Sequence, residues 1–129
     1  MPELEDLLFD PIEVNRRLLA GLLLPYASIQ RNDGKVVFKD QWYALNIKKK
    51  ILVHLASRKA ATILGLLDEE AEPQFPNEIE SYTEIKGNSL RPALKELMEE
   101  RLLEQSSDGR YFIPGIKIHT VATQVFKME

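Results

Sequence analysis

The sequence predicts a mainly α-helical protein with small β-hairpins, an α+β fold class. Two observations lead to this prediction. Apolar residues recur with the 3.6-residue period of a helix in several stretches. Asp-Gly turn sequences twice separate short apolar runs, which is the pattern of a β-hairpin. The chain has 129 residues, of which 44% are hydrophobic, so it is long enough to bury one core.

The central stretch, residues 77–114, carries the clearest helical pattern. Leu90, Leu94 and Leu97 recur at i, i+4 and i+7, which places them on one face of a helix. Pro92 restricts where this helix begins, because proline is tolerated in the first turn and is unfavourable later. Asn88 or Ser89 is therefore the expected N-cap.

The residues on either side of this helix predict a second helix and a hairpin. Upstream, Ile79 and Ile85 belong to a short apolar pattern that opens after Pro76, and a tight turn at Gly87 joins the two helices. Downstream, Asp108-Gly109 lies between two apolar runs, the second of which is Tyr111-Phe112-Ile113. This is a strong hairpin signal.

The run KGNSLRPALKELMEERLLEQ-SSDGRYFI resembles the recognition helix and wing of winged-helix DNA-binding proteins. The resemblance covers about residues 45–115 and implies a winged helix-turn-helix core. It also implies a short strand near Phe75, before the second helix of the core. One residue departs from the family pattern: many relatives have glycine where this chain has Arg101, which must adopt a left-handed backbone or end the helix differently.

The chain divides into three expected units. Residues 1–40 form an N-terminal helix and β-hairpin extension, in which Asp10-Pro11 begins the helix. Residues 41–115 form the winged-helix domain, whose first helix lies within 41–67 and is interrupted near Ser57. Residues 116–129 are expected to form a C-terminal helix, a candidate dimerisation element, although their β-branched content would also fit a strand. The leucine stripe of residues 18–23 either packs on the core of its own chain or forms a dimer interface, and we expect a homodimer.

Charge is distributed unevenly along the chain. The net charge is −3, but residues 26–60 hold eight basic residues against two acidic ones, and residues 68–84 hold seven acidic residues and no basic one. An acidic protein can bind nucleic acid when its positive charges lie on one side. The alternative is that both blocks are ordinary solvated surfaces.

The outward face of the central helix contains the expected contacts to double-stranded DNA. Arg91 and Asn88 suit base edges because both side chains can bond bidentately, whereas Lys95 suits a phosphate. The remaining expected contacts are Lys86, Ser89, Pro92, Ser107, Gly109 and Arg110, with Lys48, Lys49 and Lys50 as backbone anchors. Glu96, Glu99 and Glu100 oppose deep insertion of the C-terminal half, because carboxylates repel phosphates.

We expect no enzyme, cofactor or metal site. His54 and His119 are the only histidines; they lie apart in the chain, without the spacing of helical metal ligands. The absence of cysteine excludes disulfides and thiol catalysis and fits a cytoplasmic protein. The apolar runs are too short to cross a membrane. The expected function is sequence-specific DNA binding by a small transcriptional regulator, and the alternative is a protein–protein interaction adaptor with the same fold.

Overall fold

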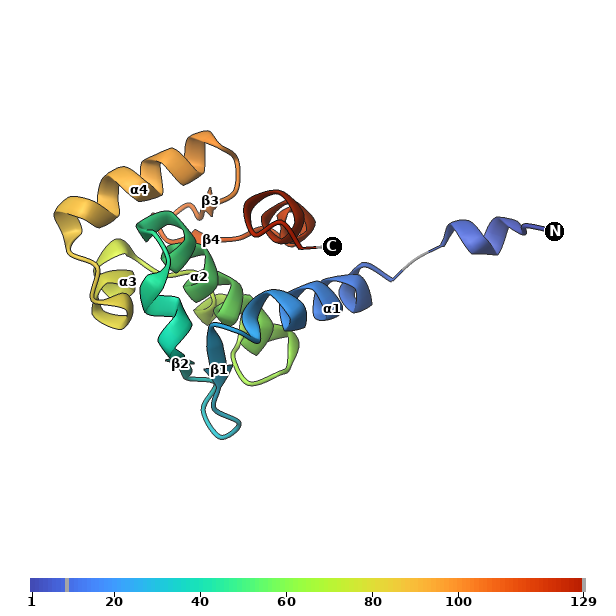
Figure 1. Cartoon of the computed structure of the whole chain (residues 1–129), viewed down its shortest axis with the longest axis horizontal. Helices are drawn as coiled ribbons and strands as arrows, with labels where there is room; N and C mark the ends of the chain where they lie inside the picture. The colour runs from blue at the N-terminus through green and yellow to red at the C-terminus, as the bar shows by residue number, and fades with distance from the viewer. Residues whose placement is uncertain (9, 129) are drawn as a thin grey trace.

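The computed structural model describes residues 1–8 and 10–128. Figure 1 shows a mostly helical body with an N-terminal arm that projects from it. Two small antiparallel hairpins complete the body, which confirms the predicted α+β class. The elements, with η for 3-10 or π turns, are η1 Leu4–Leu7, α1 Pro11–Leu23, β1 Ala27–Ile29, β2 Val36–Phe38, η2 Asp40–Ala44, α2 Ile47–Ile63, η3 Glu69–Ala71, α3 Pro76–Thr83, α4 Gly87–Glu99, β3 Glu104–Gln105, β4 Tyr111–Phe112, η4 Gly115–Lys117, α5 Ile118–Thr120 and η5 Val121–Val125.

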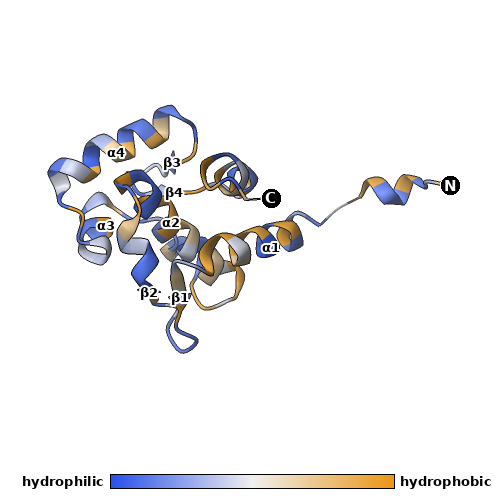
Figure 2. Ribbon diagram, in the orientation of Figure 1, coloured by the Kyte–Doolittle hydropathy of each residue, from blue (hydrophilic) through white to orange (hydrophobic). Residues whose placement is uncertain are grey.

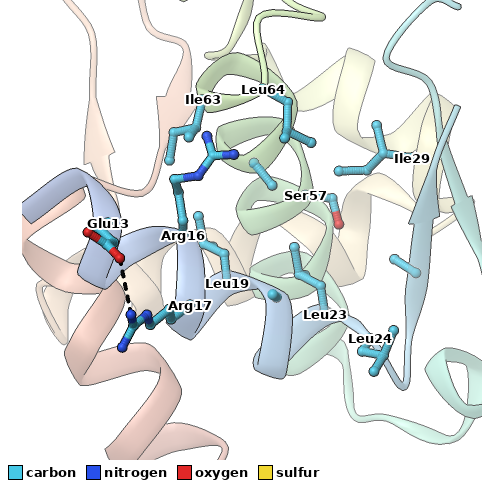
Figure 3. A pocket seen from close by; sticks show the side chains of 13 residues that line it. Glu13, Arg16, Arg17, Leu19, Leu23, Leu24, Ile29, Ser57, Ile63 and Leu64 are labelled. Carbon is cyan, nitrogen blue, oxygen red and sulfur yellow. Dashed lines mark hydrogen bonds and ion pairs between the residues drawn. The ribbon is translucent and has the colours of Figure 1, made fainter. Parts of the chain in front are cut away.

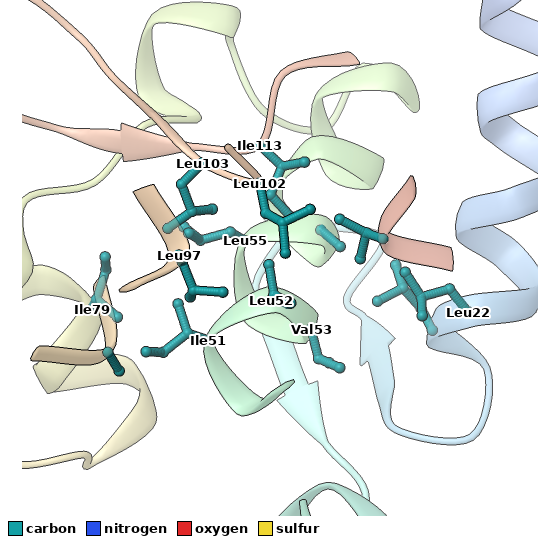
Figure 4. Close-up of a cluster of buried hydrophobic side chains, with 14 of the residues drawn as sticks. Leu22, Ile51, Leu52, Val53, Leu55, Ile79, Leu97, Leu102, Leu103 and Ile113 are labelled. Atoms are coloured by element: carbon teal, nitrogen blue, oxygen red, sulfur yellow. The ribbon is translucent and has the colours of Figure 1, made fainter. Parts of the chain in front are cut away.

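Helix α2 is the centre of the core. Its residues 51–57 are all buried, so the helix is surrounded rather than amphipathic. It packs against α1, β1, α3 and α4, and Figure 4 shows Ile51, Leu52 and Leu55 facing leucines from the neighbouring elements. Asn46 caps the helix, with its side-chain oxygen accepting from the Lys49 amide at 2.9 Å.

The helical region expected within residues 41–67 differs from the prediction at two points. A 3-10 turn, η2, precedes α2, and the two are separated at Leu45-Asn46. The expected interruption near Ser57 was wrong, because α2 runs on to Ile63. The Ser57 hydroxyl donates to the Val53 carbonyl at 2.7 Å, so the buried hydroxyl is satisfied inside the helix without breaking it.

The N-terminal extension is packed onto α2. The Asp10 carboxylate caps α1 by accepting from the Ile12 amide at 2.9 Å. Leu19, Leu22 and Leu23 are buried where α1 lies against α2. The hairpin pairs Ala27 with Phe38 and Ile29 with Val36. Most of the leucine stripe is therefore covered by the core of its own chain.

The C-terminal segment is helical, as expected from its pattern, but it combines 3-10, α and π turns. Ile118, Val121 and Ala122 are buried, and the segment packs against α1. The apolar face of this segment is thus used within the chain. A single cluster of buried residues draws on all three expected units.

The hairpin after α4 follows the predicted turn. Glu104 pairs with Phe112 and Gln105 with Tyr111, and Gly109 at the tip has φ of 93°. Arg101 adopts the left-handed conformation, with φ of 62°, so α4 ends with the geometry for which glycine is usually selected. No helix in the described part of the chain has both the length and the apolar character needed to cross a bilayer.

Candidate nucleic-acid interface

A tight turn places α4 across the end of α3. Helix α3 ends at Thr83, and Glu84 follows in the left-handed conformation with φ of 61°. Ile85 is buried in the turn and fixes it to the core. Helix α4 then runs along one edge of the molecule, away from the β1–β2 hairpin (Figure 1). A short turn thus joins the two helices, and the second of them lies at the surface.

The beginning of α4 differs from the prediction. The helix starts at Gly87 with Lys86 before it, not after Asn88 or Ser89. The Glu80 carboxylate on α3 accepts from the Gly87 amide at 3.2 Å, and this contact replaces a side-chain N-cap. Pro92 is consequently the sixth residue of the helix, where its missing amide removes one intrahelical hydrogen bond.

The faces of α4 are oriented as the leucine spacing predicts. Leu90, Leu94 and Leu97 are buried, together with Ala93. The expected DNA contacts on this helix are all exposed, namely Lys86, Asn88, Ser89, Arg91, Pro92 and Lys95. Figure 2 shows the resulting alternation of hydrophilic and hydrophobic segments along α4. The basic side chains Lys86, Arg91 and Lys95 make no ion pair within the described residues.

A shallow depression of about 340 Å³ lies beside the N-terminal end of α4. Lys50 of α2 lines it together with Lys86 and Ser89, so one of the three consecutive lysines is near the start of α4. Tyr43 of η2 also lines it and is 60% exposed. Sequence reasoning missed Tyr43, because only the packing of η2 brings it to this helix. Glu84 contributes a carboxylate at the border of the depression.

The C-terminal half of α4 is acidic and partly neutralised. Lys48 of α2 forms ion pairs with Glu100 and with Glu96, the latter at 3.6 Å. Its hydrogen bond with Glu100 raises the pKa of the Lys48 ammonium group. Lys48 is therefore occupied by the chain's own carboxylates, and Glu99 is the exposed acid at this end with no such partner among the described residues.

The other two consecutive lysines face aromatic rings. The Lys50 ammonium group lies 5.1 Å from the centre of the Trp42 ring, and that of Lys49 lies 5.7 Å from the centre of the Phe126 ring. Both contacts have cation–π geometry. The three lysines thus point to three different neighbours, and only Lys50 borders the depression beside α4.

The hairpin tip is held against the acidic loop. Ser107 is exposed, whereas Arg110 pairs with Asp108 at 2.9 Å and donates to the Glu70 carbonyl at 2.8 Å. The Ser106 hydroxyl, followed by Arg110, lowers the pKa of the Asp108 carboxyl. The guanidinium of Arg110 is therefore engaged inside the chain, while the backbone at Gly109 remains at the tip.

A one-residue bridge attaches the hairpin to the segment before α3. Gln74 exchanges two backbone hydrogen bonds with Tyr111, of 3.1 and 2.7 Å. The strand residue expected near Phe75 is thus Gln74. Phe75 instead precedes α3 as its N-cap residue, and its amide donates to the Glu78 carboxylate at 2.9 Å. The Gln74 side chain accepts a 2.6 Å hydrogen bond from the buried His54 ring. These contacts fix the hairpin relative to α2 and α3.

The two histidines lie in different surroundings. His54 is fully buried, and burial lowers its pKa to about 4. His119 is exposed on α5. Within residues 1–8 and 10–128, no group of three or more histidine, aspartate or glutamate side chains is arranged to hold a metal ion.

The surface beside and along the first turns of α4 combines exposed lysine and arginine side chains, a hydroxyl-bearing residue and an amide. These groups can bond phosphates and base edges. No protein-family model, curated protein or solved structure matches this chain.

Proposed function

We propose that the protein binds double-stranded DNA through a winged helix-turn-helix unit and acts as a small transcriptional regulator. The observation that carries this proposal is the surface at the start of α4. There Lys50, Lys86 and Ser89 line one depression, and Arg91 and Lys95 extend the positive charge along the exposed face. A basic stripe on one helix is the electrostatic footprint of a nucleic-acid contact.

The order and pairing of the elements support the winged-helix assignment. Helix α2, the bridge at Gln74, helices α3 and α4, and the β3–β4 hairpin follow one another in the chain. This is the arrangement that the resemblance of residues 45–115 implies. The bridge between Gln74 and Tyr111 also supports the proposal, because it joins the β3–β4 hairpin to the segment that precedes α3.

Helix α4 would enter the major groove with its N-terminal half. Arg91 and Asn88 would reach base edges, and Lys86, Lys50 and the Tyr43 hydroxyl would contact phosphates. Docking is limited to this half, because the exposed Glu99 on the C-terminal half, which Lys48 does not neutralise, would approach the phosphates. Ser107 and Gly109 at the hairpin tip would lie against the DNA backbone.

Fluorescence anisotropy with mixed-sequence duplex DNA at low and moderate salt tests the proposal. Affinity should fall steeply as salt rises, because each phosphate contact releases counterions. Arg91→Ala should weaken binding to a preferred sequence by about 1–3 kcal/mol. Lys86→Ala should weaken binding to all sequences and reduce the log–log salt slope by about 1.

Lys35→Ala provides the matched control. Lys35 is exposed on the loop between β1 and β2, which lies far from α4 in Figure 1, and its removal changes the net charge by the same amount. It should leave the affinity nearly unchanged. If Lys35→Ala weakened DNA binding as much as Lys86→Ala, the affinity would depend on net charge alone.

A protein-interaction adaptor is the second candidate, and the acidic residues around α4 favour it. Glu80 binds the Gly87 amide, Glu84 borders the depression, and Glu99 is exposed at the far end. These carboxylates would suit a basic protein partner. Absence of DNA binding even at low salt would reject the DNA proposal and favour this one.

A further inference from the structure

The N-terminal arm, residues 1–8, exposes leucines that the body does not cover. Leu4, Leu7 and Leu8 are between 76% and 79% exposed, and the arm projects from the body beyond the start of α1 (Figure 1). The arm nevertheless holds a defined turn. The Glu3 amide donates to the Asp6 carboxylate at 2.9 Å, and the Leu8 amide donates to the Glu5 carbonyl at 3.0 Å. Clustered apolar side chains in such a position commonly mark an interaction site.

An apolar groove of about 630 Å³ lies between α1, β1 and the end of α2. We call it the α1–α2 groove. Its apolar lining includes Ala20, Leu23, Leu24, Ile29, Ala60 and Ile63. Leu24 is 71% exposed, so this surface is open to a partner.

The rim of the α1–α2 groove is positively charged. Arg16 and Arg17 line it, and Figure 3 shows Arg16 pointing from α1 toward Ile63 on α2. Arg17 is paired with Glu13 at 3.1 Å. Arg16 makes no ion pair or hydrogen bond with the described residues. The arm carries Glu3, Glu5 and Asp6 and no basic residue, so its charge is opposite to that of Arg16.

The entry of the chain into α1 opposes docking of an arm in its own groove. The Asp10 carboxylate accepts from the Ile12 and Glu13 amides at 2.9 and 3.4 Å and fixes the chain beyond the helix N-terminus. The groove runs along α1 from Glu13 to Leu24, which is the direction away from the arm. An arm in its own groove would have to reverse direction within a few residues and lose this cap.

We propose that the arm of one copy docks in the α1–α2 groove of a second copy, and that the exchange is reciprocal. The three leucines enter the apolar lining, and the acidic side chains meet Arg16 at the rim. A reciprocal exchange gives a closed dimer with twofold symmetry. The turn already present in the arm reduces the ordering required for docking.

Sedimentation velocity of the full chain at tens of micromolar tests this dimer. The wild type should be a dimer. The variant Leu4→Ser/Leu7→Ser/Leu8→Ser should raise the dimer dissociation constant at least about 100-fold, because six buried leucines per dimer are lost. Ala20→Arg should have a similar effect, because Ala20 lines the groove from an exposed position.

Charge reversal tests the orientation of the arm. Arg16→Glu should weaken the dimer about 10-fold at low salt, and adding Glu3→Lys/Glu5→Lys in the same chain should restore most of that loss. Val37→Ser, which changes an exposed apolar residue on β2, should leave the dimer intact. Thermal unfolding of each variant verifies that the body remains folded.

A wild type that is monomeric at this concentration would overturn the proposal, whether the arm is then free or docked in its own chain. A dimer that survives both the leucine and the Ala20→Arg substitutions would overturn it equally. Neither result depends on DNA, so this proposal and the proposed function fail separately.

Discussion

Stability should fall at acidic pH because of one buried side chain, His54. Its ring is fully buried in α2, with ring centres 5.7 Å from Tyr82 and 5.9 Å from Phe38. Nε2 lies 2.6 Å from the Gln74 side-chain oxygen. Because that oxygen only accepts, Nε2 must carry the proton, and Nδ1 has no partner among the described residues. A second proton on this ring would therefore be buried without an acceptor.

The sign of the effect follows from the pKa. Burial, together with the charge of Arg58, lowers the pKa of His54 from 6.5 to about 4, against a smaller opposing effect of the Gln74 hydrogen bond. Between these values the unfolded chain binds a proton that the folded chain does not. The titration of His54 therefore leaves the free energy of unfolding unchanged above pH 6.5. It lowers the free energy of unfolding as the pH falls from 6.5 toward 4. The full loss is about 3 kcal/mol, since one pKa unit is worth about 1.4 kcal/mol.

Urea denaturation between pH 7.5 and 4.5, followed by circular dichroism, measures this loss. Carboxylates also titrate in this range, so the comparison must isolate the histidine. His54→Gln keeps a donor for Gln74 and removes the titration, and its stability should depend less on pH than that of the wild type. His119→Gln, at the exposed histidine, should behave like the wild type. Equal pH dependence of the wild type and His54→Gln would refute the reasoning.

Three further substitutions test the backbone and the ion pairs. Arg101→Gly should raise the free energy of unfolding by up to about 1.5 kcal/mol. It relieves about 1–2 kcal/mol of left-handed strain and loses about 0.5–1 kcal/mol through the more flexible unfolded chain. A destabilised variant in urea denaturation would contradict this. Lys59→Ala should destabilise the fold by about 3 kcal/mol, because it strands the Glu72 carboxylate. That pair is 2.9 Å long with both side chains at most 15% exposed. Lys48→Ala, at a more exposed pair, should cost less than about 1 kcal/mol by the same measurement.

Local patterns predicted the parts of the fold that depend on neighbours in sequence. The leucine period of residues 90–97 gave the buried face of α4 correctly, because three or four residues of spacing determine which side chains share a helix face. The Asp-Gly turns located both hairpins, because glycine supplies the positive φ seen at Gly34 and Gly109. Asp10-Pro11 correctly predicted the start of α1, since the amides that the Asp10 carboxylate caps lie two and three residues away.

Contacts between distant residues could not be predicted in this way. Helix α4 begins earlier than expected because Glu80, on another helix, binds the Gly87 amide. Gln74 pairs with a strand 37 positions further along the chain, and a one-residue bridge has no period that a sequence pattern can reveal. Tyr43 lines the depression beside α4 only because η2 packs there.

The uneven charge distribution has a different meaning in the folded chain than in the sequence. Some basic residues before position 60 form ion pairs or hydrogen bonds with the acidic segment after position 68. Lys59 pairs with Glu72, Arg58 donates to the Ala71 and Glu72 carbonyls, and Arg110 donates to the Glu70 carbonyl. These contacts hold the acidic loop against α2 and the hairpin. The net charge of −3 therefore says little about the potential at α4.

Lys48, one of the expected phosphate anchors, is paired with Glu96 and Glu100 in the folded chain. It partly neutralises these two carboxylates at the C-terminal end of α4. The cations available for a partner are then Lys86, Arg91 and Lys95, with Lys50 beside them in the depression. Because salt screens exposed charges except at short range, DNA binding should depend on these four side chains and not on the total charge of residues 26–60.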